Sequence, residues 1–380
     1  MSLGVGVIGC GNISEIYFAN SKLFRDIRVV ACADIDAGAA KRQGERHGVK
    51  VCHVADLLKR DDVEIVLNLT IPDAHAEVSL ASLEAGKHVY SEKPLATTVA
   101  DGEKILVAAK TRELRVGAAP DTILGAGYQI ARRAIDSGRI GRPLSAVAAV
   151  MSHGMEHWHP NPGFFFRKGA GPVLDMGPYY VSALVSLLGP IASVQAVARI
   201  GFAERVISAP GSKLLGHTIR VETPTSVQAL LEFDSGAQAT FHASWDVWKH
   251  SLPPIELHGE TASLRLPDPN WFGGRVEIAE GRGEWRAISA RGEPLAAVNW
   301  PLSKPVHANY RGLGLAEMAR AIIESRPHRA DGALALHALA VMTGMLVAAV
   351  EGRKLDIAAP CGRSRPLGAR EAKSLLKNSD

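Results

Sequence analysis

The sequence predicts a doubly wound parallel α/β sheet followed by an α+β domain with an open, mostly antiparallel sheet. Up to about residue 120, strand-like apolar runs alternate with helical stretches, which is the pattern of successive βαβ units. Beyond residue 143, strand-like runs recur with few helices between them, which is typical of an antiparallel sheet. The 380 residues also exceed what one ordinary core needs, so two domains are expected.

The first domain is expected to span residues 1–120. Its second strand, which ends at Ala33, has the continuous character of a strand buried on both faces. The expected strands are Val5–Ile8, Ile27–Ala33, Val63–Leu69, Lys87–Tyr90 and Arg115–Ala118. The expected helices are Asn12–Lys22, Ala37–His47, Ala74–Ala85 and Val99–Lys110.

The second domain is expected to span residues 121–359 and to end in a basic tail, residues 360–380. A helix over Thr122–Ser137 and the turn cluster Gly138–Pro143 lead into it. The expected strands are Ser145–Met151, Val194–Ile200, Ser226–Phe233, Gln238–Ser244, Ile255–Leu257 and Ala262–Leu266. The expected helices are Pro172–Leu188, Tyr310–Ser325 and Leu334–Glu351, and packing of residues 310–351 against the first domain stays open.

Charge and composition exclude several classes of protein. The net charge is +4 and is spread along the chain, whereas nucleic-acid binding needs a concentrated basic face. No apolar run reaches the length of roughly 18–20 residues that a membrane span needs, and Met1 leads directly into a strand-like run. We therefore expect a cytoplasmic protein that binds neither nucleic acid nor membrane. The four cysteines show no CxxC spacing, so reduced thiols are expected.

A glycine-rich turn follows the first expected strand. Gly9-x-Gly11-x-x-Ser14 lies between a strand and a helical stretch, which is the context of a dinucleotide-binding turn in a Rossmann domain. The first glycine permits the tight turn, and the second lets backbone N–H groups approach a pyrophosphate at the helix N-terminus. The overlapping register Gly4-x-Gly6-x-x-Gly9 has strand residues inside it, so no helix could begin there.

Asp34 ends the second expected strand, 20 residues beyond Ser14. An acidic side chain at this place binds the adenosine ribose hydroxyls and repels a 2′-phosphate. No arginine follows at once, so NAD is favoured over NADP. The alternative is that Asp34 only caps the next helix, a role that Asp36 could fill equally well.

The triplet Glu92-Lys93-Pro94 ends the fourth expected strand, and Gly169–Tyr180 begins the helix of the second domain. On that helix Asp175 and Tyr179 are four residues apart and share a face. Oxidation of a secondary alcohol requires a base within hydrogen-bond reach of the hydroxyl group. A phenol beside an ammonium and a carboxylate can relay that proton. Tyr179 is the leading general acid/base, and Lys93 in this role stays open.

These motifs, together with Thr70-Ile71-Pro72 and His75, resemble the Gfo/Idh/MocA oxidoreductases over about residues 3–355. The resemblance implies a homodimer or homotetramer paired through the open sheet. It implies NAD as cofactor, with the pyrophosphate at Gly9, Gly11, Asn12 and Ile13, the ribose at Asp34, and the nicotinamide half at Thr70, Pro72, His75, Glu92 and Lys93. It also implies that Lys93, Asp175 and Tyr179 form the catalytic set. Many members carry histidine where this chain has Tyr179, which weakens assignment as an inositol dehydrogenase.

A histidine-rich segment, His153–Pro160, contains the spacing HxxEH that is found in some zinc peptidases. Zinc chemistry would need a helix, but Gly154 and Pro160 interrupt the segment, so no metal is expected. Imidazole and indole groups suit hydrogen bonding and stacking with a polyol. His157, Trp158 and His159 are therefore candidate substrate-binding residues, and a purely structural role for this loop stays open.

The sequence thus predicts an NAD-dependent dehydrogenase or reductase that acts on a secondary alcohol or carbonyl of a sugar, sugar acid or cyclitol. Two other functions stay open. One is a non-catalytic, NAD-binding, sugar-sensing regulator, which retention of Lys93, Asp175 and Tyr179 disfavours. The other is an NAD-dependent glycosidase, in which oxidation of the substrate is transient.

Overall fold

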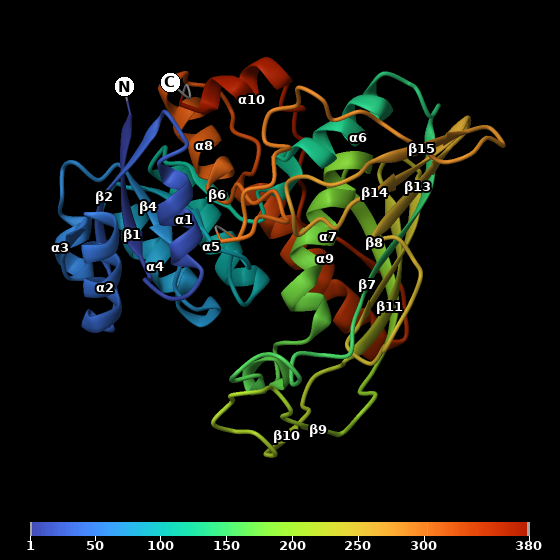
Figure 1. Cartoon of the computed structure of the whole chain (residues 1–380), viewed down its shortest axis with the longest axis horizontal. Coiled ribbons are helices and arrows are strands. Elements are labelled where there is room, and N and C mark those ends of the chain that lie inside the picture. Colours follow the sequence, from blue (N-terminus) through green and yellow to red (C-terminus); the bar gives the residue numbers. More distant parts are fainter. Residues whose placement is uncertain (1, 302, 378–380) are drawn as a thin grey trace.

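The computed structural model describes residues 2–301 and 303–377, which form two domains, each built on its own sheet (Figure 1). In the described residues, the first sheet has the strand order β3-β2-β1-β4-β5-β6, and all its neighbours pair in parallel. Its strands are β1 Leu3–Ile8, β2 Ile27–Ala33, β3 Lys50–Val51, β4 Ile65–Asn68, β5 His88–Ser91 and β6 Val116–Ala118. The expected doubly wound sheet is confirmed. Strand β3, whose two residues are both exposed, was not among the predicted strands.

Helices connect these strands, and local capping explains where several of them begin and end. Asp36 caps α2 by accepting a hydrogen bond from the Gly38 N–H (2.8 Å), and Gly48 ends the helix with φ 68°. Thr98 caps α5 in the same way, through the Asp101 N–H. The helices are α1 Ser14–Ser21, α2 Ala37–His47, α3 Val54–Leu58, α4 Pro72–Glu84 and α5 Val99–Thr111. The strand order reverses between β1 and β4, so the turn after β1 opens at the switch point where such sheets bind ligands.

The second sheet is mixed and mostly antiparallel, as expected. Its order is β16-β15-β14-β13-β7-β12-β11-β8-β17, and β7 and β12 are its one parallel pair among the described residues. Its strands are β7 Pro143–Met151, β8 Ile191–Arg199, β11 Ser226–Phe233, β12 Gln238–Ser244, β13 Ile255–Gly259, β14 Ala262–Leu266, β15 Glu277–Glu280, β16 Arg286–Ala287 and β17 Leu355–Asp356. A separate ribbon pairs β9 Glu204–Val206 with β10 Thr218–Arg220.

Helices cover one face of the second sheet. In β11, buried Val227, Ala229 and Leu231 alternate with exposed residues such as Leu230, which is the pattern of a sheet with one covered face. The covering helices lie to the left of the strands in Figure 1, and no helix of the described residues lies on the right-hand face. These helices are α6 Ala126–Asp136, α7 Pro172–Leu188 and α9 Gly332–Glu351, preceded by the short 3₁₀ turns Thr122–Leu124 and Gly163–Phe166.

The C-terminal elements connect the two domains. Helix α8, Leu313–Ile323, packs on β6 and β2 of the first sheet, and α9 contacts α5 and β6 as well as α7 and β8. The segment 360–377 also packs against the molecule and contains α10, Ala369–Leu375, whose Leu375 is buried. The Lys377 N–H donates to Leu23 O (2.8 Å), which ties this end beside the first domain.

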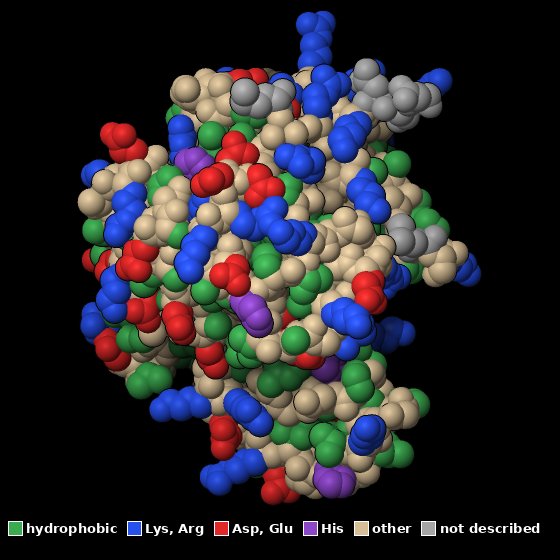
Figure 2. Space-filling model, turned by 90° about the vertical axis from the view of Figure 1, so that its left-hand side faces the viewer, with side chains coloured by type: hydrophobic (Ala, Val, Ile, Leu, Met, Phe, Trp, Pro, Cys, Tyr) green, Lys and Arg blue, Asp and Glu red, His purple; other side chains and the backbone are tan. Residues whose placement is uncertain are grey.

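The prediction that no apolar run reaches the length of a membrane span is wrong, because helix α9 is long and apolar enough. The helix has 20 residues, its most apolar stretch of 18 has a mean hydropathy of 2.1, and half of that stretch is buried inside the protein. Length and apolar composition are also what a helix between two sheets needs, and α9 packs on β8 and α7. Figure 2 shows acidic and basic side chains intermixed over the face that the first domain presents.

Candidate active site

Gly9 sits where the nucleotide-binding turn crosses the neighbouring strand. Its φ is 102°, and a Cβ atom there would lie 2.5 Å from the Leu69 carbonyl and 2.7 Å from the Thr70 nitrogen. Only glycine fits both constraints. Gly11 has open space around the position of a Cβ, and Asn12 and Ile13 are exposed beside it. The turn is therefore accessible to a ligand at the N-terminus of α1, as the pyrophosphate of a dinucleotide requires.

Asp34 lies at the end of β2 beside this turn. Its carboxylate accepts hydrogen bonds from the Cys10 N–H (2.6 Å) and the Asp36 N–H (2.8 Å). Asp36, not Asp34, caps α2, so the capping alternative does not account for Asp34. Around it opens a hollow of about 480 Å³. Its lining comprises Cys10, Gly11, Asn12, Glu15, Asp34, Asp36, Ala39, Arg42, Gln43 and Arg46.

His75 is buried and connects two backbone segments, a structural role that the sequence did not predict. Its Nδ1 lies 2.6 Å from Pro94 O and its Nε2 lies 3.0 Å from Thr70 O. The ring is 1% exposed, so it joins two backbone segments rather than lining an open surface. Thr70 is partly exposed and Pro72 is exposed at the first turn of α4. These two residues stay available to a cofactor, while His75 fixes the turn that carries Lys93.

Glu92 and Lys93 follow β5 and point in different directions. Glu92 is buried, and it accepts hydrogen bonds from the Tyr17 hydroxyl (2.8 Å) and the Lys93 N–H (2.8 Å). Burial raises the pKa of Tyr17, so its hydroxyl stays protonated and donates. Tyr17, on α1, is a site residue that the sequence reading missed. Lys93 extends instead toward the second domain.

Lys93 meets the first turn of α7. Its ammonium donates to Asp175 O (2.7 Å) and to Asp175 Oδ1 (2.8 Å), and it lies 5.4 Å from the centre of the Tyr179 ring. The side chains of Lys93 and Asp175 are 18% and 25% exposed, so the pair is open to a ligand. The structure therefore brings together the three residues that the sequence predicts, from both domains.

Local sequence explains why α7 begins here. Gly171 has φ 98°, and a Cβ there would lie 2.9 Å from Pro224 O. Pro172 then occupies the first helical turn, where its missing N–H removes no hydrogen bond. Asp175 and Tyr179 follow at a spacing of four residues and face the first domain.

The electrostatic surroundings keep Lys93 charged. Burial lowers the pKa of Lys93, but the Asp175 carboxylate and its hydrogen bond raise it by more, so the pKa lies above the usual lysine value. A lysine in this state donates hydrogen bonds and does not accept a proton near neutral pH.

Arg311 is a second cation at this site, and no sequence signal indicated it. It is 8% exposed, and its Nη2 lies 3.3 Å from the Tyr179 hydroxyl oxygen. The guanidinium also donates to Asn309 Oδ1 (2.9 Å) and Asn270 Oδ1 (2.7 Å). Asn20 on α1 binds the carbonyl groups of Asn309 and Arg311, both at 3.0 Å, which fixes the loop before α8.

The histidine-rich segment lies in a separate lobe of loops with β9 and β10, at the bottom of Figure 1. His157 lines a hollow of about 920 Å³ together with His153, Arg205 and Trp248, and the lining residues include none of Lys93, Asp175 and Tyr179. His159 packs edge-on against the rings of Phe164 and Phe165, and Trp158 is 56% exposed. Substrate binding by these three residues stays a prediction.

The HxxEH spacing is occupied by other contacts. Glu156 forms an ion pair with Arg205 (2.8 Å), and His153 stacks on Trp248 with ring centres 3.4 Å apart. The segment forms bends and turns, not the helix that zinc ligation at this spacing needs.

The fold and the site define a dinucleotide-binding protein with a lysine, a carboxylate and a phenol at the domain junction. Comparison with protein families places it further: "Oxidoreductase family, NAD-binding Rossmann fold" matches residues 3–119, and "GFO/IDH/MocA C-terminal domain" matches residues 128–265. The chain belongs to the Gfo/Idh/MocA oxidoreductases, and its first domain is an NAD-binding Rossmann domain.

Among curated relatives, the inositol 2-dehydrogenase of Ralstonia nicotianae is 38% identical over 152 residues, covering 38% of this chain and 44% of the relative. The chain thus aligns with less than half of that protein's length. The levoglucosan dehydrogenase of Pseudarthrobacter phenanthrenivorans is 25% identical over 291 residues, covering 69% of this chain and 73% of the relative.

Solved structures share the fold across almost the whole chain. An NAD-binding oxidoreductase from Klebsiella pneumoniae has a TM-score of 0.80 at 20% identity, covering 95% of this chain and all of that one. A levoglucosan dehydrogenase in complex with NADH and L-sorbose has a TM-score of 0.77 at 19% identity, covering 94% of this chain and 99% of that one.

Proposed function

We propose that this protein is an NAD-dependent dehydrogenase or reductase that acts on a secondary alcohol or carbonyl of a sugar, sugar acid or cyclitol. The observation that carries the proposal is the junction of Lys93, Asp175 and Tyr179 beside the nucleotide-binding sheet. Relatives named inositol 2-dehydrogenase and levoglucosan dehydrogenase support the substrate class.

The residues of the chain divide the chemistry between them. NAD, when bound, accepts or supplies the hydride. Lys93 donates a hydrogen bond to the reacting oxygen and stabilises the charge that develops on it. Asp175 holds the ammonium in place through the 2.8 Å ion pair. Tyr179 takes the hydroxyl proton in oxidation and returns it in reduction, and the raised pKa of Lys93 supports this division of roles.

The residues around the first turn favour NAD over NADP. The Asp34 carboxylate faces the hollow in which the adenosine ribose would lie, and a 2′-phosphate would be repelled there. Arg42 and Arg46 line the same hollow, although Arg42 already lies 3.8 Å from the Asp36 carboxylate. We expect a clear preference for NAD, measured as the ratio of kcat/KM with the two cofactors. Equal use of NADP would contradict the role of Asp34.

The decisive experiment assays monosaccharides, sugar acids and cyclitols with NAD and with NADP, by NADH or NADPH absorbance. Lys93→Ala is expected to lower kcat/KM for the best substrate by about 10²- to 10³-fold, the range for loss of one hydrogen-bond donor to a developing oxyanion. Lys110→Ala, which removes an exposed lysine of α5, is the matched control and is expected to keep full activity. Full activity of Lys93→Ala would rule out the mechanism.

The same assay separates the two other functions. NAD binding without turnover of any compound in the panel would favour a sugar-sensing regulator. Release of the aryl group from an aryl glycoside without net NADH formation would favour a glycosidase.

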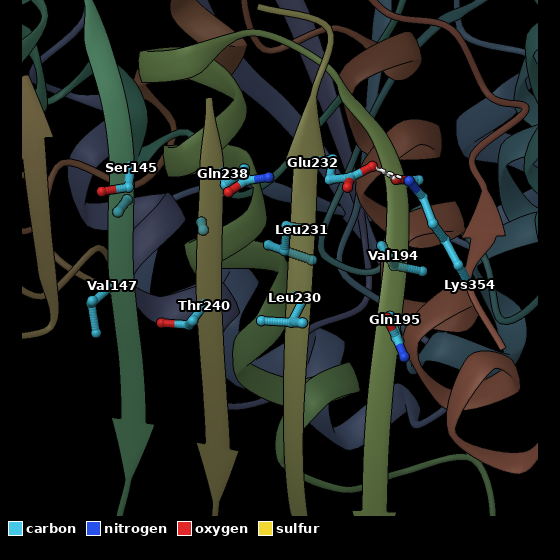
Figure 3. Close-up of a pocket in the computed structure, with 13 residues that line it drawn as sticks. Ser145, Val147, Val194, Gln195, Leu230, Leu231, Glu232, Gln238, Thr240 and Lys354 are labelled. Carbon is cyan, nitrogen blue, oxygen red and sulfur yellow. Dashed lines mark hydrogen bonds and ion pairs between the residues drawn. The ribbon is translucent and has the colours of Figure 1, made fainter. Parts of the chain in front are cut away.

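We also propose that the uncovered face of the second sheet pairs with a second copy of the chain. Leu230 and Val197 are 55% and 67% exposed on strands whose alternate residues are buried. Figure 3 shows this face, with Leu230 and Thr240 on adjacent strands and Lys354 bonded to Glu232 at the rim. A shallow hollow of about 320 Å³ lies among them. Light scattering is expected to give twice or four times the chain mass of 40.4 kDa, and a monomer would contradict the proposal.

A further inference from the structure

We propose that Arg311 is a positioning residue that stabilises the anionic form of Tyr179, so that this phenol can accept the substrate proton. The inference rests on the proposed function and assigns a fourth residue to the same site. In oxidation, the substrate O–H bond breaks and a phenol O–H bond forms, while the hydride leaves the carbon for NAD. Arg311 neither gives nor takes a proton in this step.

The first ground is the contact itself. The Arg311 Nη2 lies 3.3 Å from the Tyr179 oxygen, and the guanidinium carbon lies 5.9 Å from the ring centre. Guanidinium has donors and no acceptor, so this hydrogen bond runs from Arg311 to the phenol. A donor of fixed charge favours the phenolate over the neutral phenol. Lys93 approaches the same ring at 5.4 Å, so the phenol lies within reach of two cations.

The second ground is that the charge of Arg311 has no direct counter-ion. Among residues 2–301 and 303–377, no carboxylate forms an ion pair with it, and its side-chain partners are the amides of Asn309 and Asn270 and the Tyr179 hydroxyl. Burial lowers the pKa of Arg311, but Tyr179 and Glu92 raise it by more, so the group stays charged. A buried cation that no carboxylate bonds directly still favours the ionised form of a neighbour that loses a proton.

The third ground is that neighbouring elements hold Arg311 rigidly. Asn309 and Asn270 fix two arms of the guanidinium, and the Trp271 ring centre lies 5.8 Å from its carbon. Asn20 fixes the backbone of the same loop from α1. The cation is thus placed before a substrate arrives, which is the condition for electrostatic stabilisation without reorganisation.

Several other charged groups surround this pair and contribute to any pH profile. Lys93 and Asp175 act on the Tyr179 side of the site. Glu92 and Tyr17 act on Arg311 from the first domain. Asp121 and Asp268 also interact with Arg311, and His307 interacts with Asp268. The experiment therefore assigns the tyrosine transition by removing Tyr179 itself.

The test measures the pH dependence of kcat/KM in the wild type, Arg311→Gln and Arg311→Lys. Loss of a charged hydrogen bond predicts a decrease of about 10- to 100-fold for Arg311→Gln near neutral pH. The deficit is expected to shrink as pH rises, because hydroxide then ionises the phenol without help. Arg311→Lys is expected to recover part of the activity. Arg275→Gln, at an exposed surface pair, is the control and is expected to match the wild type.

A second measurement needs no turnover. Ultraviolet difference spectra follow tyrosinate formation, and subtraction of the same titration for Tyr179→Phe isolates Tyr179. Its transition is expected to move to higher pH in Arg311→Gln. If the substrate panel shows no activity at all, this titration still decides the role of Arg311, so failure of the proposed function remains distinguishable.

Asn270→Asp is a second variant that tests the same role if Arg311→Gln does not fold. It keeps Arg311 and the volume of the side chain, but it places a carboxylate where the guanidinium now bonds an amide at 2.7 Å. The ion pair is expected to weaken the action of Arg311 on Tyr179 and to produce the same two changes on a smaller scale. An unchanged tyrosinate transition, or an activity loss equal at every pH, would overturn the proposal.

Discussion

Arg311 and Arg205 are both buried guanidinium groups, 8% and 4% exposed, but their partners differ. Arg205 forms ion pairs with Glu156 and Asp246, and it donates to Trp245 O (2.9 Å). Arg311 bonds two amides and a phenol and, among the described residues, no carboxylate. The Arg205 charge is neutralised in place, so it holds the lobe of β9 and β10 together. The Arg311 charge is left to act on a neighbour, so we assign it to chemistry.

The aromatic surroundings follow the same division. The Arg205 guanidinium lies 4.6 Å from the Phe202 ring centre and 5.7 Å from that of Phe166, within a cluster that includes Trp245. The Arg311 guanidinium lies near the rings of Tyr179 and Trp271. One of the two rings at Arg311 can ionise, whereas neither ring at Arg205 can. Variants that separate stability from activity test this comparison.

The largest expected effect on stability is that of Arg205→Met. Removing the cation leaves the buried Glu156 carboxylate and the partly buried Asp246 carboxylate without a counter-ion, which is expected to cost roughly 3 kcal/mol of unfolding free energy. Urea unfolding followed by tryptophan fluorescence measures it. Arg311→Gln removes the ion-pair partner of no carboxylate among the described residues, and it is expected to lower the unfolding free energy by less than half as much.

The matched control for Arg205→Met carries Glu156→Gln and Asp246→Asn in addition. Neutral amides need no counter-ion, so this triple variant is expected to recover most of the lost free energy. If the triple variant is no more stable than Arg205→Met, the carboxylates without a counter-ion are not the cause of the lost unfolding free energy. The packing of Arg205 against Phe202 and Phe166 would then explain the loss.

The elements that could be predicted from the sequence are those that local patterns determine. The bounds of β2, α2 and α7 agree with the expected ranges, because continuous apolar character, caps and Pro172 define them. The strands β3 and β9 were missed because each is two or three residues long and mostly exposed, so neither carries an apolar pattern. A pattern of alternation cannot be recognised over so few residues.

The residues of the candidate site also fall into those that the sequence predicts and those that it does not. Asp175 and Tyr179 could be predicted because both lie on one helical face, four residues apart. Arg311 meets Tyr179 across 132 residues of sequence, and Tyr17 meets Glu92 across 75. Such contacts depend on how the domains pack, and no spacing in the chain encodes them. His75 was assigned to the cofactor from its motif, whereas its two ring nitrogens bond backbone carbonyls.

A smaller effect is expected from Asp121, a buried carboxylate in the Arg311 region. It accepts hydrogen bonds from the Gly312 N–H (3.0 Å) and the Gly314 N–H (2.9 Å), and burial raises its pKa from 3.8 to about 6. Between these values the folded state binds more protons than the unfolded state, so this contribution to stability falls as pH rises.

Asp121→Asn removes this titration while it keeps an acceptor for both N–H groups. The variant is therefore expected to gain stability relative to the wild type as pH rises from about 4 to about 7, by roughly 2 kcal/mol. Urea unfolding at the two ends of that window measures the difference. A gain of equal size at both ends would show that Asp121 does not titrate in this window.

The smallest expected effect is that of His157→Ala, which tests whether the lobe of β9 and β10 contacts the substrate. The His157 ring is exposed and lines the hollow of about 920 Å³ beside Arg205 and Trp248. If this hollow receives part of the substrate, His157→Ala removes binding that ground state and transition state share. KM is then expected to rise about 5-fold with kcat unchanged. His217→Ala is the control, because His217 is exposed in the same lobe and does not line the hollow. Unchanged KM in both variants would contradict substrate binding by His157.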